Sequence, residues 1–414
     1  MSANDRIFYA CQAVAISDMG NDSLSLNEIV RGAQSIGMTT NFNLEQAFEL
    51  GQIDIYENIE GVPDLEVTME KVLDGYPLIY HMATTGIEIT ESGLVGRSKQ
   101  RADVRLGIYS DGLNNVVSAQ GANQNNGNAE VEVYCSGMYM SSISYSFQTD
   151  GSATESVTLV GNNKQWLTGN DVKILDATVG NDLDGLNGND SPLAIGSDAN
   201  PSGGIVQRED FLLEACIMPR LIDGVYDAAG TNATHPNGSG YGNAWDHENN
   251  SPTIHVQSVT VSTDFGREDI LELGAKTPYA RPANFPIEVT CEIEAVTVSG
   301  DFVSAYEYGD DELYTTVDSG NNTRNEAIFF YTRAGYGFDL GDKNRLQSVT
   351  YGGGDAGGGN ASCTYSFSNF NVLDVQDQRI HTDATHGSYV GHKYLSKGNT
   401  DVGGGTFPSK FKIN

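Results

Sequence analysis

The chain has 414 residues, 55 of them acidic and 23 basic, and its formal net charge of −32 excludes a protein that grips nucleic-acid phosphates through its overall charge. Hydrophobic residues make up 39% and charged residues 19%, so the chain can bury sizeable cores and is not disordered as a whole. The length favours two or three domains over one. Solubility is the usual explanation of such acidity, and the alternative is a surface that lies near DNA without binding it; charge alone does not choose between them.

The N-terminus and the cysteines indicate the compartment. The first residues contain no basic-then-apolar signal peptide, and no apolar run approaches the ~20 residues that span a bilayer. The cysteines form no C-x-x-C pair, their count is odd, and several lie in apolar runs. We therefore expect buried free thiols in a protein made in a reducing cytoplasm. They are Cys11, Cys135, Cys216, Cys291 and Cys363.

The first elements predicted along the chain are a short helix and an alternating strand. Residues 43–51 predict the helix, because their apolar side chains recur along one side, Asn41 or Asn43 can cap the start, and Gly51 can end it. From residue 65 to 70, apolar and polar side chains alternate. A period of two is typical of a strand with one buried and one wet face.

Further strands follow in chain order. Residues 104–109 and 157–160 indicate core strands, and residues 267–274 are the counterpart of the predicted helix. Residues 287–294 alternate in the same way as the earlier strand, and residues 328–331 form another apolar run. Glycine-rich turns between runs of Tyr, Phe, Val, Ile and Thr are typical of a β protein.

The two halves of the sequence repeat one another. Residues 34–42 align with residues 257–265, and the register continues without a gap to Pro63 and Pro286. Convergent strand patterning is the alternative explanation, but it would not keep several blocks in sequence order. Further blocks match in that order: residues 66–68 with 288–290, residues 142–147 with 362–367, and residues 10–11 with 215–216.

The repeat predicts two tandem copies of one domain, at residues 1–179 and 208–385. Between them, residues 180–207 form a linker rich in Gly, Asp and Asn. The second copy carries an inserted loop at 230–250, expected at the surface, and residues 386–414 form a C-terminal arm. The predicted fold class is all-β, with two tandem β-sandwich or barrel domains that each have a short helix packed on the sheet.

Signatures of catalysis and of metal binding are weak. The chain has no G-x-S-x-G, no phosphate-binding glycine loop with its Lys, and no H-E-x-x-H. Acids in the linker lack the ligand alternation and the bidentate Glu of a calcium loop, and the histidine groups lack a zinc spacing. We expect a plain acidic loop and solvated histidines, with no catalytic residue, metal or cofactor. The candidates weighed are Asp182, Asp184 and Asp190 for calcium, and His235, Asp246 and His247 or His381, His386 and His392 for another metal.

Glycoside hydrolysis needs two carboxylates that stand out from the rest. Glu288, Glu292 and Glu294 lie on the outward face of a predicted strand, where a wet, charged face is the ordinary explanation. Trp166 and Trp245 are the only tryptophans, too few for a carbohydrate-stacking platform. The sequence therefore favours a protein that is not an enzyme.

Several blocks together resemble a known family. A strand ends in Val-Gln-Ser, a short Glu-rich segment closes on Glu-Leu-Gly, and a Tyr precedes an Asn-Phe-Pro-Ile-Glu-Val-Thr strand. These patterns, with the strands that close the first copy, are similar to the tail tube proteins of tailed phages. The blocks are residues 256–258, 272–274, 279 and 284–290, and residues 143–147 and 155–166.

The resemblance implies rings of six β domains that stack into a tube through which genomic DNA is delivered. Strands of each domain join a continuous inner barrel, so sheet edges are satisfied between subunits. Because this chain carries two domains, we expect homotrimeric pseudo-hexameric rings, with homohexameric rings as the alternative. The resemblance also implies contacts with other tail proteins, namely sheath or tail terminator and baseplate. It places the protein in the virion tail, assembled in the host cytoplasm and without a membrane contact.

DNA would pass the acidic lumen without specific binding, because like charges repel over about one Debye length, ~8 Å at physiological salt. Glu66, Glu70, Glu288 and Glu292 could face the lumen or the exterior. Two other interpretations stay open. A decoration, baseplate or fibre protein would not stack on itself, and a carbohydrate-active β-sandwich enzyme would turn over a glycan.

Overall fold

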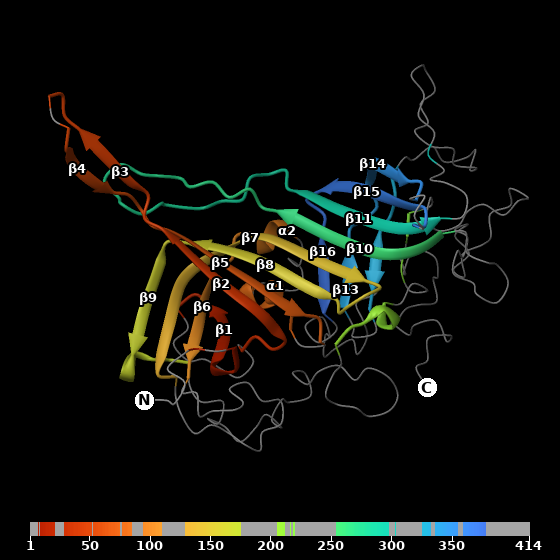
Figure 1. The fold of residues 1–414 in the computed structure, drawn as a ribbon, viewed down its shortest axis with the longest axis horizontal. Coiled ribbons are helices and arrows are strands. Elements are labelled where there is room, and N and C mark those ends of the chain that lie inside the picture. Colours follow the sequence, from red (N-terminus) through yellow and green to blue (C-terminus); the bar gives the residue numbers. More distant parts are fainter. Residues whose placement is uncertain are drawn as a thin grey trace, which may run out of the picture. The chain divides into compact units, whose positions relative to one another are not determined.

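The computed structural model consists mainly of antiparallel β-strands, as Figure 1 shows. It divides into two compact units that are not consecutive halves of the sequence. Unit 1 comprises Met1–Ser144, Thr154–Pro192 and Asp264–Ile287, and unit 2 comprises Tyr145–Ala153, Leu193–Thr263 and Glu288–Asn414. The structure describes residues 7, 9–20, 29–51, 53–74, 77–84, 94–109, 129–174, 205–211, 216, 218–219, 254–297, 303, 325–332, 336–354 and 359–377.

Unit 1 contains the strands that come first in the chain. In the sheet, β7, β8, β5 and β2 lie in that order, β6 joins β7 to β1, and β9 pairs with β7. The strands are β1 (Gln12–Asp18), β2 (Ala33–Asn41), β3 (Leu44–Phe48), β4 (Ile55–Glu60), β5 (Asp64–Val72), β6 (Ala102–Ile108), β7 (Val131–Gln148), β8 (Thr154–Gly161) and β9 (Asn163–Thr168). Short helical segments are η1 (Tyr9–Cys11), α1 (Ile79–Ala83), α2 (Leu94–Arg97) and η4 (Gly169–Asp171).

The alternation expected for residues 65–70 is confirmed in β5. Leu65, Val67 and Met69 are buried, whereas Glu66 and Glu70 are exposed on the opposite face. β6 and β8, predicted as core strands, also lie in the core. Because strand side chains alternate between faces, the hydrophobic pattern alone determines which face of β5 is buried.

The core of unit 1 also holds paired charges. The carboxylate of Glu155 accepts hydrogen bonds from the backbone N–H groups of Ile79 and Tyr80, at 2.7 and 3.0 Å. It thereby satisfies two donors at the start of α1, whose five residues are all buried and which packs against β1, β6 and β8. Arg105 Nη1 lies 2.6 Å from Glu132 Oε1, and both side chains are buried.

The predicted helix at 43–51 is wrong. Residues 44–48 form β3, which pairs with β4 in an antiparallel hairpin, with Glu45 opposite Ile59. An isolated helix this short is marginal unless one face is buried, and here the apolar side chains stay exposed. In the hairpin, the backbone groups of β3 form their hydrogen bonds with β4 instead of within a helix. The counterpart at 267–274 is not helical either and forms a single bridge between Ile270 and Ala280.

Unit 2 is a two-layer β-sandwich. One layer has β14, β15, β11 and β10 in that order with the C-terminal end of β7, and the other has β12, β13 and β16. Tyr145 and Phe147 of β7 pack on Phe338 of β13, with ring centroids 4.6 and 5.4 Å apart. The elements are β10 (Ile254–Asp264), β11 (Glu288–Thr297), β12 (Phe329–Tyr331), β13 (Tyr336–Asp339), β14 (Arg345–Gly352), β15 (Ser362–Phe370), β16 (Asp374–Asp377) and the turn η5 (Arg208–Asp210).

The two aligned segments of the predicted repeat share one structural feature. β2 pairs with β5 and β10 pairs with β11, and each pair is irregular at the glutamine of its aligned Gln-Ser block, Gln34 and Gln257. Residues 142–147 lie in β7 and residues 362–367 lie in β15, and these two strands do not occupy equivalent places in the strand order. β15 lies beside β11 as β8 lies beside β5, so β8, and not β7, takes the place of β15. The tandem duplication stays a prediction.

The five cysteines are free and buried, as the sequence predicts. Burial raises the pKa of Cys135 from its ordinary 9.0 to about 11 and that of Cys216 to about 12, and it also raises the pKa of Cys291. Among the described residues, no helix is long and apolar enough to cross a membrane. The expected linker core at 180–204, the loop at 230–250 and the C-terminal arm at 386–414 lie outside the described residues.

Candidate assembly surface

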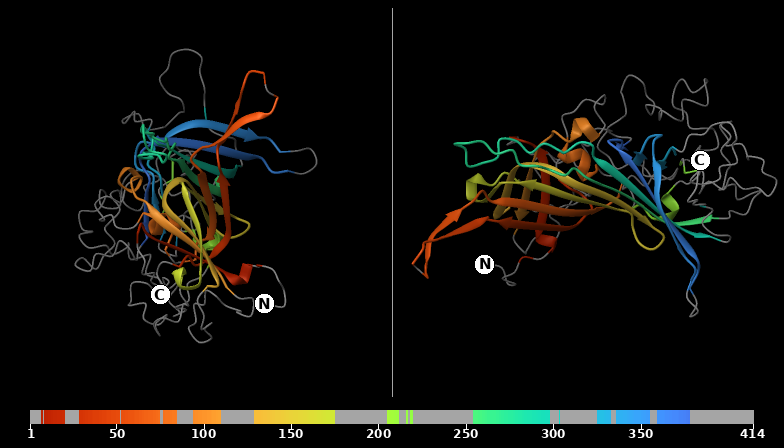
Figure 2. Two further views of the ribbon diagram at one scale, coloured as in Figure 1. Left: turned by 90° about the vertical axis from the view of Figure 1, so that its left-hand side faces the viewer. Right: turned by 90° about the horizontal axis from the view of Figure 1, so that it is seen from above.

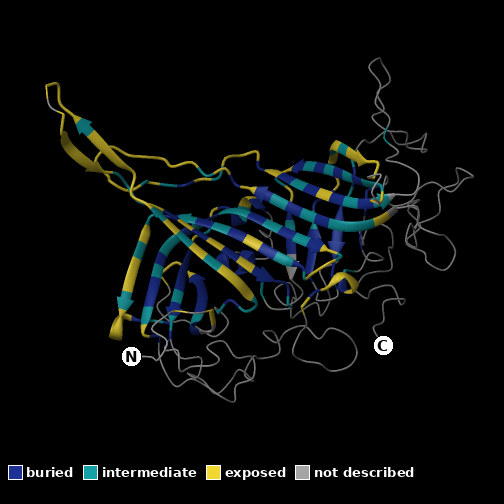
Figure 3. Ribbon diagram, viewed as in Figure 1, coloured by how far each residue is buried: buried dark blue, intermediate teal, exposed yellow. Residues whose placement is uncertain are grey.

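Two projecting segments of unit 1 carry large apolar side chains into solvent. Arm 1 is the β3–β4 hairpin with its flanks, residues 42–62 apart from position 52. Arm 2 comprises residues 265–286. Both project toward one side of unit 1, on the left in Figure 1 and in the right-hand view of Figure 2, and Figure 3 shows them as exposed over most of their length.

Exposed apolar side chains run along both arms, and those at the tips are the most exposed. Leu50 and Ile53 in arm 1 and Leu273 in arm 2 are fully exposed. The remaining members are Phe42, Leu44, Phe48, Ile55, Tyr56 and Ile59 in arm 1, and Ile270, Leu271, Tyr279 and Phe285 in arm 2. The hydrophobic effect is worth roughly 25 cal/mol per Å² of apolar surface removed from water, so covering such a surface stabilises whatever covers it. Large exposed apolar surfaces are typical of sites of protein–protein contact.

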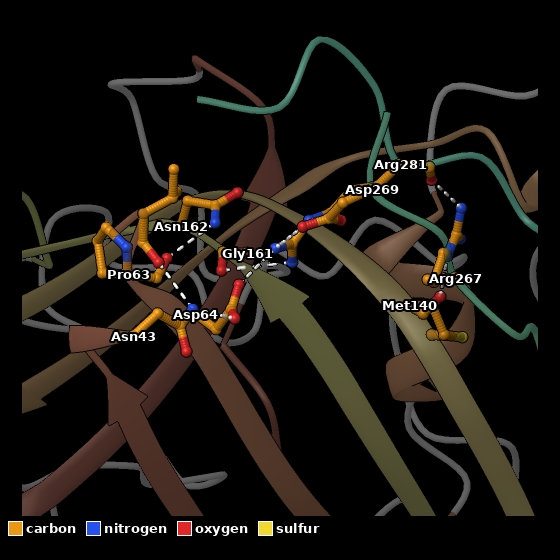
Figure 4. Close-up of polar contacts among 10 residues, drawn as sticks. Asn43, Pro63, Asp64, Met140, Gly161, Asn162, Arg267, Asp269 and Arg281 are labelled. Atoms are coloured by element: carbon orange, nitrogen blue, oxygen red, sulfur yellow. Dashed lines mark hydrogen bonds and ion pairs between the residues drawn. The ribbon is translucent and has the colours of Figure 1, made fainter. Parts of the chain in front are cut away.

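A buried arginine joins the bases of the two arms (Figure 4). Arg281 Nη2 donates to Asp64 Oδ1 and to Asp269 Oδ2, each at 2.8 Å. Its Nη1 lies 3.5 Å from the backbone carbonyl oxygen of Gly161 at the end of β8. We call these residues the clamp: Arg281, Asp64, Asp269 and the Gly161 carbonyl. The Arg281 side chain is 8% exposed, and the carboxylates of Asp64 and Asp269 are about half and a third exposed.

A second arginine anchors arm 2 to β7. Arg267 Nε donates to the Met140 carbonyl oxygen at 2.8 Å, and Nη1 donates to the Arg281 carbonyl oxygen at 2.9 Å. Its guanidinium lies over the rings of Tyr139 and Phe265, with distances of 5.0 and 5.3 Å to the ring centroids. Burial lowers the pKa of Arg267 from 12.5 to about 10, so the group is still charged at neutral pH.

Each unit also presents a polar sheet face that carries acids. In unit 1 this face has Glu66 and Glu70 of β5 opposite Thr39 and Ser35 of β2. In unit 2, Glu288, Glu292 and Glu294 of β11 point to the same side of the strand, because alternate residues share a face. Their cross-strand neighbours on β10 and β15 are Ser258, Thr260, Thr364, Ser366 and Phe370. The glutamates named in the sequence prediction therefore do lie on the polar faces.

Several strands pair on one side only within the described residues, among them β1, β9, β12 and β16. The strands at the two ends of the longest strand order are β2 in unit 1 and β14 in unit 2. Apolar side chains on them, such as Ile36 and Leu346, are half-buried rather than covered. An edge strand with unpaired N–H and C=O groups is a template for pairing with another chain.

The metal candidates fall outside the described residues, and this includes both histidine groups and the three linker aspartates. Among the described residues, no group of three or more His, Cys, Asp or Glu side chains is arranged to hold a metal ion. Sequence reasoning missed the clamp. In a chain with few basic residues, two arginines within arm 2 are the signal that could have pointed to it.

No protein-family model and no curated protein matches the chain. Among solved structures, the cap that terminates the tube of the anti-feeding prophage is 14% identical, with a TM-score of 0.29, and the match covers 41% of this chain and 95% of the cap chain. A chain of the PVC sheath–tube complex, from an extracellular contractile injection system, is 11% identical, with a TM-score of 0.28, over 40% of this chain and 95% of its own. A chain of the PVC sheath/tube terminator is 13% identical, with a TM-score of 0.28, over 40% of this chain and 100% of its own. Likenesses this distant assign no function.

Proposed function

We propose that this chain is a structural, non-enzymatic subunit of a phage-type tail tube, in which copies form rings that stack around an acidic lumen. The observation that carries the proposal is the pair of exposed apolar arms. Leu50 and Ile53 at the tip of arm 1 and Leu273 at the tip of arm 2 are fully exposed. Among the described residues of unit 1, no surface covers them. Such apolar tips are satisfied when a second copy covers them.

The edge strands β2 and β14 support a contact between neighbouring copies within a ring. Pairing of β2 of one copy with β14 of the next would satisfy both edges at once and would repeat head to tail. Two domains per chain would then close as a trimer with pseudo-sixfold symmetry, and a hexamer with one domain outside the tube is the alternative. The sequence resemblance to tail tube proteins points the same way.

The acidic faces support the passage of DNA. Glu66, Glu70 and Glu292 lie opposite serine or threonine, and Glu288 lies opposite Phe370. Acids on these faces repel phosphates at short range. DNA would therefore slide through the lumen without specific binding. A sheath or tail terminator and a baseplate are the other expected partners, in a virion tail assembled in the host cytoplasm.

Negative-stain electron microscopy of the purified chain tests the proposal. Hollow rings or stacked tubes are expected, and end views with threefold or sixfold class averages give the number of chains. Leu271→Ser with Leu273→Ser should abolish stacking, whereas Ile205→Ser, an exposed apolar position outside the arms, should leave it intact. Monomers at all concentrations and salts would count against the tube and favour a decoration, baseplate or fibre role.

A further inference from the structure

We propose that Arg281 is a positioning residue that holds arm 1 and arm 2 in one mutual orientation, so that both arms meet a neighbouring copy together. The inference rests on the proposed function, because it takes the arms as assembly surfaces. It concerns unit 1 alone, since that unit contains both arms and the whole clamp.

The base of arm 1 is closed by Asn43 and Asp64. Asn43 has φ +47°, a left-handed conformation that Asn tolerates better than most residues. Its Nδ2 donates to the Val62 carbonyl oxygen at 2.9 Å and to Asp64 Oδ2 at 2.6 Å, and its own carbonyl oxygen accepts from the Gly61 N–H at 3.2 Å. These contacts tie the two ends of the hairpin together. The same Asp64 carboxylate then binds Arg281 through its other oxygen.

The base of arm 2 is closed around the same guanidinium. Ile270 and Ala280 form the only bridge of arm 2, with the Ile270 N–H 2.9 Å from the Ala280 carbonyl oxygen. Asp269 and Arg281 are the residues next to that bridge, one on each side, and they form an ion pair. One guanidinium therefore binds one carboxylate at the base of each arm.

The charges of the clamp explain why the loss of Arg281 should disturb both arms. With Arg281 in place, two carboxylates are neutralised by a nearly buried cation that presents several donors in a fixed plane. Without it, Asp64 and Asp269 would face each other as like charges and push the arm bases apart. A lysine would keep the charge but could not supply the fork of donors to both carboxylates.

The two arginines have separable roles. Arg267 binds the Met140 carbonyl oxygen and stacks on Tyr139 and Phe265, so it anchors arm 2 to β7. Arg281 instead contacts carboxylates of the two arm bases and the end of β8. Loss of Arg281 should therefore change the order of the arms and not the stability of the core.

Hydrogen exchange of the unassembled chain tests the coupling directly. Arg281→Gln should raise exchange at the amides of Gly61, Ile270 and Tyr279 about tenfold, the scale of one lost charge-assisted hydrogen bond, while amides of β6 stay protected. At the arm 2 amides of Ile270 and Tyr279, Asp64→Asn combined with Arg281→Gln should exchange no faster than Arg281→Gln alone, because Arg281→Gln already removes the ion pair through which Asp64 contacts arm 2. Arg208→Gln, an exposed arginine in η5, is the control and should exchange like the parent chain.

Assembly is measured on the same variants by sedimentation. The protein concentration at which tubes form should rise about tenfold for Arg281→Gln, by less for Arg281→Lys, and not at all for Arg208→Gln. Unchanged arm exchange in Arg281→Gln, or a matching rise in β6 exchange, overturns the positioning role. Loosened arms with normal tube formation overturn its link to assembly. Loosened arms in a chain whose parent never forms tubes uphold the coupling and refute the tube proposal.

Discussion

At the residue scale, the buried pair of Arg105 and Glu132 makes the core of unit 1 sensitive to the loss of either partner. Glu132 binds Arg105 with one oxygen, and its other oxygen accepts the N–H groups of Lys173 and Ile174 at 2.6 and 2.8 Å. A truncated partner would leave a buried guanidinium and two backbone donors without their acceptor.

We predict that Glu132→Ala lowers the free energy of unfolding by about 3–5 kcal/mol, the range for breaking a buried ion pair. Urea unfolding followed by circular dichroism measures the loss. Glu66→Gln, on the exposed face of β5, is the matched control and should change the value by less than ~0.5 kcal/mol. A loss below ~1 kcal/mol for Glu132→Ala would show that water or a rearranged partner replaces the carboxylate.

The buried thiols give a prediction that depends on pH. Because burial raises the pKa of Cys135 to about 11 and of Cys216 to about 12, little reactive thiolate exists at pH 8, and a thiol-specific reagent should modify neither residue before unfolding. Unfolded thiols ionise near pH 9, so the thiols keep their full contribution to stability below pH 9 and lose it as the pH rises toward 11–12. Mass spectrometry after alkylation, and unfolding curves from pH 8 to 10.5, check both statements. Rapid native labelling at pH 8 would contradict the burial.

At the scale of elements, arm 1 should be removable without loss of the fold. None of its described residues is fully buried, and its backbone hydrogen bonds close within the hairpin. We predict that replacement of residues 44–60 by Asn-Gly, which suits a tight hairpin turn, leaves the melting temperature within a few degrees and abolishes stacking. Differential scanning calorimetry and electron microscopy measure the two effects. Glu57→Gln within arm 1 is the control that should stack normally, and an unfolded deletion variant would mean that the arm supports the core.

The arms also show which features of the fold could not be predicted from the sequence. The alternation of apolar and polar residues in β5 and β11 predicts the strands correctly because one face of each strand is buried within its own unit. The burial of the cysteines follows from the sequence for the same reason. Residues 43–51 were predicted as a helix because apolar side chains spaced along one side imply a buried face within the chain. Within the part of the chain that the structure describes, no surface buries these side chains, so the spacing did not produce a helix. The two arginines of arm 2 were visible in the sequence, but the pairing of Arg281 with Asp64 was not, because these residues are 217 positions apart.

At the scale of the whole molecule, the net charge of −32 should govern assembly. Like-charged copies repel, and salt screens that repulsion with a Debye length of about 10 Å at 0.1 M. We predict that the concentration needed for tube formation falls as sodium chloride rises from 20 to 300 mM. Sedimentation at fixed protein concentration measures it. Assembly that weakens with salt would instead indicate ion pairs between copies as the main contact.

The polar faces allow the lumen to be located. If they line a tube, Glu66→Lys with Glu70→Lys and Glu288→Lys with Glu292→Lys would place cations where only DNA with free ends can reach. Tubes of that variant should retain short linear duplexes at 150 mM salt but not closed circular DNA, and the retention should fall steeply with salt. Control tubes with Glu130→Lys and Glu209→Lys, at exposed positions off these faces, should retain both kinds of DNA equally or neither. Equal capture of circular DNA by the first variant would place Glu66 and Glu288 on the outside of the tube, and the acidic lumen would then have to be sought on another face.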